Sequence, residues 1–568
     1  MSLSHRIAPF SVLLSVLLSS SSLSAQDARQ PLFVDRVDVN IVNVEVWVTD
    51  DQGRRVQGLE KEDFELLEDG APVEITNFYS TARPKPYMAM LEGATPSPAQ
   101  QDEPSPDVPP DQRLHLVVLV DHFNTLPVNR NEALGELEPF LEDRVRQGDR
   151  VMLIGFDRSL DVVEPFTGNF EGIQRGLREL RKKPSSKPML EAERRRRLRE
   201  ITIAWQIDPA EPNSAYDAVR AQVQQEEQTL RQTAKALENV LRSLAGMPGR
   251  KAILYLSDGL PKRPAEELYE QYGRLFGLTP DGGDPFVEAL RQNQAPLLNR
   301  IAREANAQQV TLYTVDTRGT AGGSTLSSEF ADLTPGIGGS ASLGVGRTFN
   351  YQETLVDIAN ATGGSTVLNT TNYDQAIASV AEDFDVFYSL GYAARQGGDG
   401  GFHKIEVRVR QPGLKVRHRR GYVDKPQEER IADRTLSSLI LDMEKNPLEV
   451  EIDFGTPEKQ SRRAYHLPVL IRMPLRHLTL LPNGEVEQGS LRIYLAVKDD
   501  GGVSDMQEFS YPIEVPVGTA ASANQEVGYT ALLRIGPGKP TIAVGVWDEI
   551  SGTDAFVHRQ VLIGPDRN

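Results

Sequence analysis

Ten residues, LVVLVDHFNT at 116–125, decide how the middle of this 568-residue chain folds. The unbroken apolar run at their start is typical of a strand that is buried on both faces of a sheet. The run stops on Asp121, and Asn124 and Thr125 follow it. A buried charge is costly unless something pairs with it, and strand tips are where doubly wound sheets bind ligands. The sequence therefore raises three possibilities for this tip: it holds a metal ion, it holds a partner, or it starts a loop.

Outward from this stretch, apolar strands alternate with amphipathic helices over residues 113–386. Further strands of this kind are RVMLIGF (150–156), KAILYLS (251–257) and VTLYTV (310–315). The alternation predicts an α/β domain with a doubly wound, mainly parallel sheet that helices cover on both faces.

Two polar segments interrupt this α/β pattern. A polar helical insertion is expected at about 184–212, and its basic stretch ERRRRLRE, 193–200, is expected to be a solvated helical face. Residues 319–347 are rich in Gly and Ser, which predicts a flexible loop.

The segments before and after the α/β domain, 34–82 and 387–424, are predicted to form β-strands. Val44, Val46 and Val48 alternate with polar residues, but segment 34–82 holds too few strands for a stable sandwich. We therefore expect residues 387–424 to complete that sandwich. The Pro- and Ser-rich stretch 83–112 is expected to be an extended linker.

The C-terminal part is expected to fold separately. Residues 425–446 are expected to form a helical linker. The short strands of 447–568, with their turns, predict a separate C-terminal β-sandwich.

The N-terminus has the pattern of a secretory signal at 1–25: Arg6, an apolar stretch from Ile7 to Leu18, and small residues up to Ala25. We expect cleavage and export to the periplasm or the extracellular space, with no integral membrane segment left; an uncleaved anchor is the alternative. The chain has 0 cysteines, which excludes disulfides and thiolate metal sites. Its net charge of -18 argues against nucleic acid as a partner.

Three polar features are expected to meet at one edge of the α/β sheet, because the carboxyl ends of parallel strands lie on the same side. The first follows the strand ending at Asp121, the second is the start of a long helix near 213, and the third follows Ser257. Two carboxylates with hydroxyl or amide oxygens suit Mg²⁺ or Ca²⁺. The candidate metal ligands are Asp121, Asn124, Thr125, Asn213, Ser214 and Asp258.

This arrangement resembles the von Willebrand factor A domain with its metal-ion-dependent adhesion site. Stretches such as VLVDHFNT (118–125) and LVDIANATGGSTVLNT (355–370) more specifically resemble the von Willebrand factor A-related proteins of Acidobacteria, over about 34–424. The family pattern is D-x-S-x-S, a threonine and a further aspartate. By position, these correspond to Asp121 and Thr125, to Asn213 or Ser214, and to Asp258. Phe123 stands in place of the first serine, and Asn124 is the substitute oxygen.

The resemblance implies an exported adhesion or protein-binding module, with a divalent cation bridging to a carboxylate of the partner. A metal-assisted hydrolase is the first alternative, with metal-bound water at Asp121 and Asp258 and His122 or Asp157 as base. A structural envelope protein without a ligand is the second. Neither a phosphate loop nor a nucleophile elbow occurs near these residues, so the chain is not expected to be an enzyme.

Overall fold

The chain forms two compact units, which we describe one at a time. The larger unit is Val39–Asp442, and the smaller unit is Met443–Asn568 together with residues 1–38. The predicted signal peptide at 1–25 and the predicted linker at 83–112 lie outside the described residues. The computed structural model describes residues 41–82, 113–245, 247, 249–318, 340–370, 373–394, 398–441, 444–461, 464–499, 502–504, 506–518 and 525–564.

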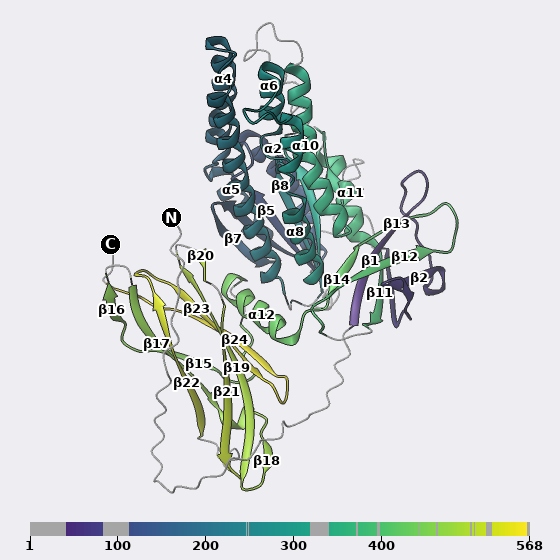
Figure 1. Ribbon diagram of the computed structural model, residues 1–568. Helices are drawn as coiled ribbons and strands as arrows, with labels where there is room; N and C mark the ends of the chain where they lie inside the picture. Colours follow the sequence, from purple (N-terminus) through teal and green to yellow (C-terminus); the bar gives the residue numbers. More distant parts are fainter. Residues whose placement is uncertain are drawn as a thin grey trace. The chain divides into compact units, whose positions relative to one another are not determined.

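A six-stranded sheet forms the centre of the larger unit (Figure 1). In spatial order its strands are β10 (Thr366–Val367), β9 (Val310–Asp316), β8 (Arg250–Ser257), β5 (Leu114–Asp121), β6 (Arg150–Asp157) and β7 (Ser159–Thr167). Strands β10 to β6 are parallel, and β7 pairs antiparallel at the edge. The chain adds strands first on one side of β5 and then on the other. The crevice between β5 and β8 is therefore the place where such a sheet can bind a ligand.

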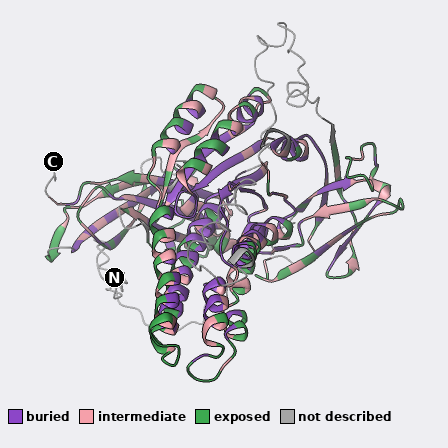
Figure 2. Cartoon of the chain, turned by 90° about the horizontal axis from the view of Figure 1, so that it is seen from above, coloured by how far each residue is buried: buried purple, intermediate pink, exposed green. Residues whose placement is uncertain are grey.

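Helices cover both faces of this sheet. Those on one face are α2 (Pro127–Arg146), α3 (Phe170–Lys182) and α11 (Tyr373–Asp385), and those on the other include α5 (Asn213–Ser243), α8 (Ala295–Ala307) and α10 (Ser340–Ala361). Leu116, Val118 and Val120 share a core with residues of α2, α3 and α11. Because side chains alternate along a strand, Asp121 points to the opposite face, toward α5. Figure 2 shows the central strands as almost wholly buried.

Further helices continue the larger unit beyond the strands. They are α4 (Lys187–Ile207), α6 (Glu266–Phe276), α7 (Pro285–Arg291) and α12 (Gln427–Leu441). We call α4, α6, α7 and the first part of α10 the helical cover, since α6 contacts each of the other three. Within it, Leu198 and Ile201 of α4 pack in one apolar cluster with Val219 of α5.

Two sequence-based expectations for this region are wrong. The stretch 193–200 is not wholly a solvated face, because Arg194 is only 1% exposed and pairs with buried acids. Residues 340–347 are not a flexible loop, because α10 already begins at Ser340. Burial of Leu343 in the core of the helical cover and ion pairs of Arg347 stabilise this first part of the helix.

The β-strands before and after the α/β part form two sheets that share one core. One sheet has the order β13 (Lys415–His418), β1 (Ile41–Thr49), β11 (Val386–Ala393), β4 (Asn77–Ala82). The other has the order β14 (Gly421–Val423), β12 (Phe402–Val409), β2 (Phe64–Glu68), β3 (Ala71–Pro72). Val44 lies opposite Leu390, and Leu66 lies opposite Val407, so apolar residues from both ends of the larger unit meet.

The smaller unit is all-β in its described residues, apart from a short 3₁₀ turn at Leu475–His477. In one sheet β17 (Ala464–Pro474) pairs with β15 (Glu451–Phe454), β16 (Glu458–Ser461) and β22 (Glu526–Ile535). In the other, β19 (Val486–Asp499) pairs with β18 (Leu481–Asn483), β20 (Gly502–Val503), β21 (Gln507–Pro516) and β23 (Thr541–Asp548), and β23 pairs with β24 (Asp554–Gln560). One apolar core joins the two sheets. The protein is thus a mixed α/β structure with a C-terminal all-β region.

Helices in the described ranges do not combine the length and the apolar character that a membrane-spanning segment needs.

Candidate functional site

The carboxyl ends of β5 and β8 hold a buried polar cluster. Asp121 is 0% exposed and accepts hydrogen bonds on both of its carboxylate oxygens. The Asn124 backbone N–H donates to Oδ1 at 3.0 Å, and the Asn124 side-chain amide donates to Oδ2 at 2.8 Å. The Tyr255 hydroxyl at 2.5 Å and the Ser257 hydroxyl at 3.2 Å also donate to Oδ2. We call Asp121, Asn124, Tyr255, Ser257 and Asp258 the strand-end cluster.

The second carboxylate of the cluster, Asp258, also accepts hydrogen bonds on both of its oxygens. The Leu126 backbone N–H donates to Oδ2 at 3.3 Å, while the Asn129 amide and the Thr317 hydroxyl donate to Oδ1 at 3.4 and 2.5 Å. Burial raises the pKa of both Asp121 and Asp258, and at Asp258 the Lys187 ammonium counteracts that rise. Sequence reasoning correctly expected these two strand tips to meet, since β5 and β8 are parallel neighbours.

The turn after β8 allows the helical cover to approach this cluster closely. Gly259 has φ +89°, and a Cβ atom there would lie 2.4 Å from the carbonyl oxygen of Tyr351 on α10. A larger residue at 259 would both strain the turn and push α10 away.

The loop after Asp121 is fixed from several sides. The Phe123 ring is buried and packs edge-on against Phe156, with ring centroids 6.0 Å apart. The Ser185 hydroxyl donates to the Thr125 carbonyl at 2.7 Å, and the Thr125 hydroxyl is buried without a hydrogen-bond partner. The loop therefore belongs to the packed interior rather than to an open tip.

His122, one of the two candidate bases, lies on the other face of the sheet from Asp121. Its Nδ1 is 3.0 Å from the Arg130 guanidinium. Its Nε2 fills the space next to Gly155, where a Cβ atom would come within 2.9 Å of it. Burial, helped by the Arg130 charge, lowers the pKa of His122 to about 3. A neutral ring that accepts from Arg130 is a packed residue of the α2 side, separated from the strand-end cluster by the strand itself.

The structure does not bring Asn213 and Ser214 to this site. They begin α5, whereas the α5 residue that reaches the cluster is Thr233, whose hydroxyl is 3.0 Å from the Asn124 amide. At 1.5 Å per residue, the 20 positions between them span about 30 Å. The helix starts far beyond the sheet edge because the insertion lengthens it. Asking which α5 residue lies level with the ends of the strands, instead of looking for the first residue of the helix, could have pointed to Thr233.

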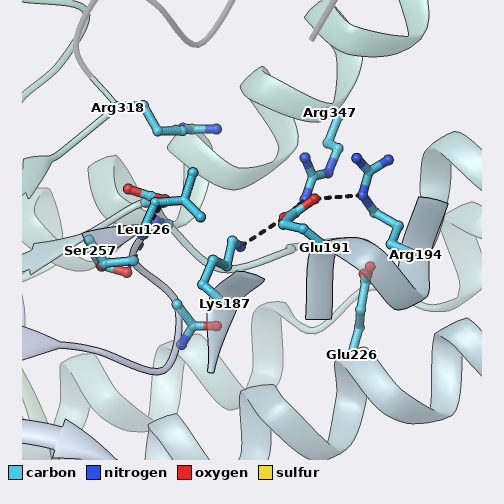
Figure 3. A network of polar contacts seen from close by, with 12 residues as sticks. Leu126, Lys187, Glu191, Arg194, Glu226, Ser257, Arg318 and Arg347 are labelled. Carbon is cyan, nitrogen blue, oxygen red and sulfur yellow. Dashed lines mark hydrogen bonds and ion pairs between the residues drawn. The ribbon is translucent and has the colours of Figure 1, made fainter. Parts of the chain in front are cut away.

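A second group of charges, which sequence reasoning missed, lies next to the cluster. Glu191 of α4 contacts three cations: Lys187 at 3.3 Å, Arg194 at 2.9 Å and Arg347 at 2.5 Å (Figure 3). Arg347 also lies 3.4 Å from Glu267 of α6. Although burial opposes it, the three cations lower the pKa of Glu191 well below its ordinary value. We call these five residues the charged network; it joins α4, α6 and α10.

A sixth charge, Glu226 of α5, lies beside this network (Figure 3). It accepts from the Gln222 amide at 2.8 Å and from the Ala265 backbone N–H at 2.9 Å. Burial and the neighbouring Glu267 raise the pKa of Glu226 to about 7. A cavity of about 30 Å³, enough for one water molecule, separates the network from the strand-end cluster, with Asn124, Lys187 and Glu226 among its lining residues.

The predicted divalent cation can be tested against these contacts. Mg²⁺ and Ca²⁺ require several oxygen ligands with open lone pairs. In the strand-end cluster both carboxylates already accept from protein donors on each oxygen, and Phe123 supplies no ligand atom. A cation here would have to displace some of these donors or use the lone pairs left on Asp121 Oδ1 and Asp258 Oδ2, each of which accepts one donor. The Mg²⁺ or Ca²⁺ site stays a prediction of the sequence.

Comparisons with known proteins identify no family for this chain. No protein-family model and no curated protein matches it. Among solved structures, the conserved hypothetical protein BatB from Bacteroides thetaiotaomicron matches 48% of this chain and 98% of its own, with 13% identity and a TM-score of 0.23. Human COPII-coat protein Sec24c covers 80% of this chain and 44% of its own, at 9% identity and TM-score 0.22. Three N-terminal domains of the type V pili tip protein Mfa5 from Porphyromonas gingivalis cover 93% and 79%, at 9% identity and TM-score 0.20.

Proposed function

We propose that the larger unit is a von Willebrand factor A-type module and that the chain is an exported protein-binding protein. The motif stretches at 118–125 and 251–259 support this assignment, as does the order of the central sheet with its antiparallel edge strand β7. The partner surface lies on the helices and loops at the carboxyl edge of that sheet. The module holds its partner by side chains of the helical cover, and the buried acids below it fix the position of those helices.

The observation that carries this proposal is the exposure of large apolar side chains on the helical cover. Ile207 at the end of α4 is 79% exposed, Phe286 on α7 is 61% exposed, and Phe349 on α10 is 65% exposed. Ile203 and Leu290 on α4 and α7 are also exposed. Apolar surface that gathers on one part of a protein marks interaction sites, whereas single exposed apolar residues scattered elsewhere need no explanation.

The charges below the helical cover explain how it is held in place. Glu191 joins α4 to α10 through Arg347, and Glu267 joins α6 to both through Arg347 and Arg194. Ion pairs of this kind contribute little net stability. We infer that here they specify one arrangement of the helices that carry them. A fixed arrangement lowers the entropy lost when a partner binds. The strand-end cluster then serves as a rigid base rather than as the contact itself.

Site-specific photo-crosslinking in the native organism tests the proposed surface. A photoreactive residue replaces Ile207 or Phe286 in the full-length protein, and the matched control carries it at Leu532, an exposed apolar position of the smaller unit. We expect the same crosslinked protein from positions 207 and 286, and no such product from 532. Equal products from all three positions, or products from 532 alone, contradict the proposal. Turnover of ester or peptide substrates that Asp121→Ala abolishes would instead favour the hydrolase.

A further inference from the structure

A second acidic site lies in the β-sandwich, away from the central sheet. Strand β2 ends at Glu68, and the turn residue Asp69 follows it beside strand β12, which carries His403. The His403 Nδ1 atom is 2.8 Å from Asp69 Oδ2 and 3.9 Å from Glu68 Oε1. One ligand-type atom from each residue lies within 4.8 Å of the other two, and among the described residues only this group of three or more His, Asp or Glu side chains meets that condition. We call Glu68, Asp69 and His403 the sandwich trio.

Each side chain of the trio is held by a partner on its outer side. The Tyr422 hydroxyl donates to Glu68 Oε1 at 2.7 Å, and the Lys404 backbone N–H donates to Asp69 Oδ1 at 2.8 Å. The His403 Nε2 atom is 3.2 Å from Asp399 Oδ1. Metal-binding histidines and carboxylates are oriented by outer hydrogen bonds of this kind, with the second histidine nitrogen on a carboxylate. The Asp69 Oδ2 and His403 Nδ1 atoms face each other at 2.8 Å, and the Glu68 oxygen nearest to His403 Nδ1 is Oε1, at 3.9 Å.

The independent sign of a ligand is Glu68. This residue is 3% exposed, and its Oε2 atom is buried without a hydrogen-bond partner. A buried carboxylate oxygen without a donor costs free energy, because it has lost water and gained nothing in return. A cation that both oxygens of Glu68 contact would supply the missing partner. The Asp69 side chain is 53% exposed, so this cation would also have an open side toward solvent.

We propose that Glu68, Asp69 and His403 bind a divalent transition-metal ion, with Zn²⁺ as the best fit. One imidazole nitrogen and two carboxylate oxygens match the ligands that Zn²⁺ accepts, and two carboxylate charges balance its charge. The ion takes the place of the proton on His403 Nδ1, so binding releases that proton to solvent. The fourth position stays open for water or for a carboxylate of a partner. This inference does not depend on the proposed function, since the trio lies in a different part of the larger unit.

Zinc content and zinc titration of the full-length protein test the proposal. We expect one Zn²⁺ per chain after dialysis against a zinc buffer, and a zinc-dependent rise in Tm. His403→Ala abolishes both, and Tyr422→Phe weakens binding by about 10- to 100-fold. The matched control is His477→Ala, which removes another histidine that lies beside a glutamate, 3.2 Å from Glu449. This variant should bind zinc as the unmodified protein does.

The contradicting results are equally definite. Absence of stoichiometric zinc, or zinc binding that His403→Ala leaves unchanged, overturns the proposal and leaves the trio as an ion pair between a protonated histidine and carboxylates. If His403→Ala does not fold by circular dichroism, Asp69→Asn replaces it. Asp69 is exposed and lies in a left-handed turn, φ 50°, that asparagine tolerates. This variant should fold and lose at least about tenfold in zinc affinity.

Discussion

The strand-end cluster and the sandwich trio both place carboxylates at the end of a β-strand, yet they offer opposite chemistry. Asp121 lies at the end of β5 and accepts four hydrogen bonds from protein donors. Glu68 lies at the end of β2 with one buried oxygen that accepts none. In the first set every carboxylate oxygen accepts from a protein donor, whereas in the second set one oxygen, Glu68 Oε2, accepts from none. Availability of lone pairs, rather than the presence of acids at a strand tip, therefore separates a structural cluster from a candidate binding site.

The largest expected effect on stability comes from an aspartate-to-asparagine substitution, made once in the strand-end cluster and once in the sandwich trio. Asp121→Asn puts an amide donor where the Tyr255 and Ser257 hydroxyls already donate, so buried donors are left without an acceptor. We expect a loss of about 3–4 kcal/mol in the free energy of unfolding. Asp69→Asn, at an exposed position, should cost less than about 1 kcal/mol. Urea denaturation of both variants without added metal measures the difference. Equal losses in the free energy of unfolding would show that the two sets of acids do not differ as proposed.

The α/β architecture of the central part could be predicted from the sequence because its strands are continuous apolar runs. The run from Leu116 to Val120 is 0–1% exposed, as expected of a strand covered on both faces. Because parallel neighbours end at one edge, the proximity of Asp121 and Asp258 also followed from the sequence. The donors that close off Asp121 did not, because Tyr255 points toward it only through the register of β8 against β5.

Other parts of the site depend on tertiary contacts that no local pattern encodes. Thr233 reaches Asn124 because the insertion sets the length and phase of α5. Four arginines in a row suggested a solvated surface, yet Arg194 points inward, because it meets Glu191 of its own helix and Glu267 of α6. Charged residues are almost never buried without such partners, and the partners lie up to 156 positions apart in the chain. Short-range patterns therefore predict the strands and helices but miss the ion pairs that hold the helical cover together.

A medium effect is expected from the centre of the charged network. Glu191→Gln removes the charge shared by Lys187, Arg194 and Arg347, although Glu267 still faces the two arginines. We expect a loss of about 2–3 kcal/mol, below the full cost of breaking a buried pair. The matched control on the same helix is Glu200→Gln, because Glu200 is 44% exposed and its partner Arg196 is 53% exposed. That change should stay within about 0.5 kcal/mol, and thermal unfolding of both variants gives the comparison.

The last expected effect is a pH dependence at Glu226, which lines the cavity between the strand-end cluster and the charged network. Burial and Glu267 raise the pKa of Glu226 from 4.5 to about 7, while Arg347 opposes the rise. A folded-state pKa above the unfolded one means that the folded protein binds the extra proton. The contribution of Glu226 to stability is therefore complete below pH 4.5 and falls as the pH rises to about 7. Glu226→Gln keeps an uncharged acceptor for Ala265, so the variant should gain on the unmodified protein between pH 5 and 8. A parallel pH dependence of the two unfolding free energies would show that Glu226 does not take up this proton on folding. In that case the donors and cations around Glu226 would offset the burial of its carboxylate, and Glu226 would resemble the hydrogen-bonded Asp121.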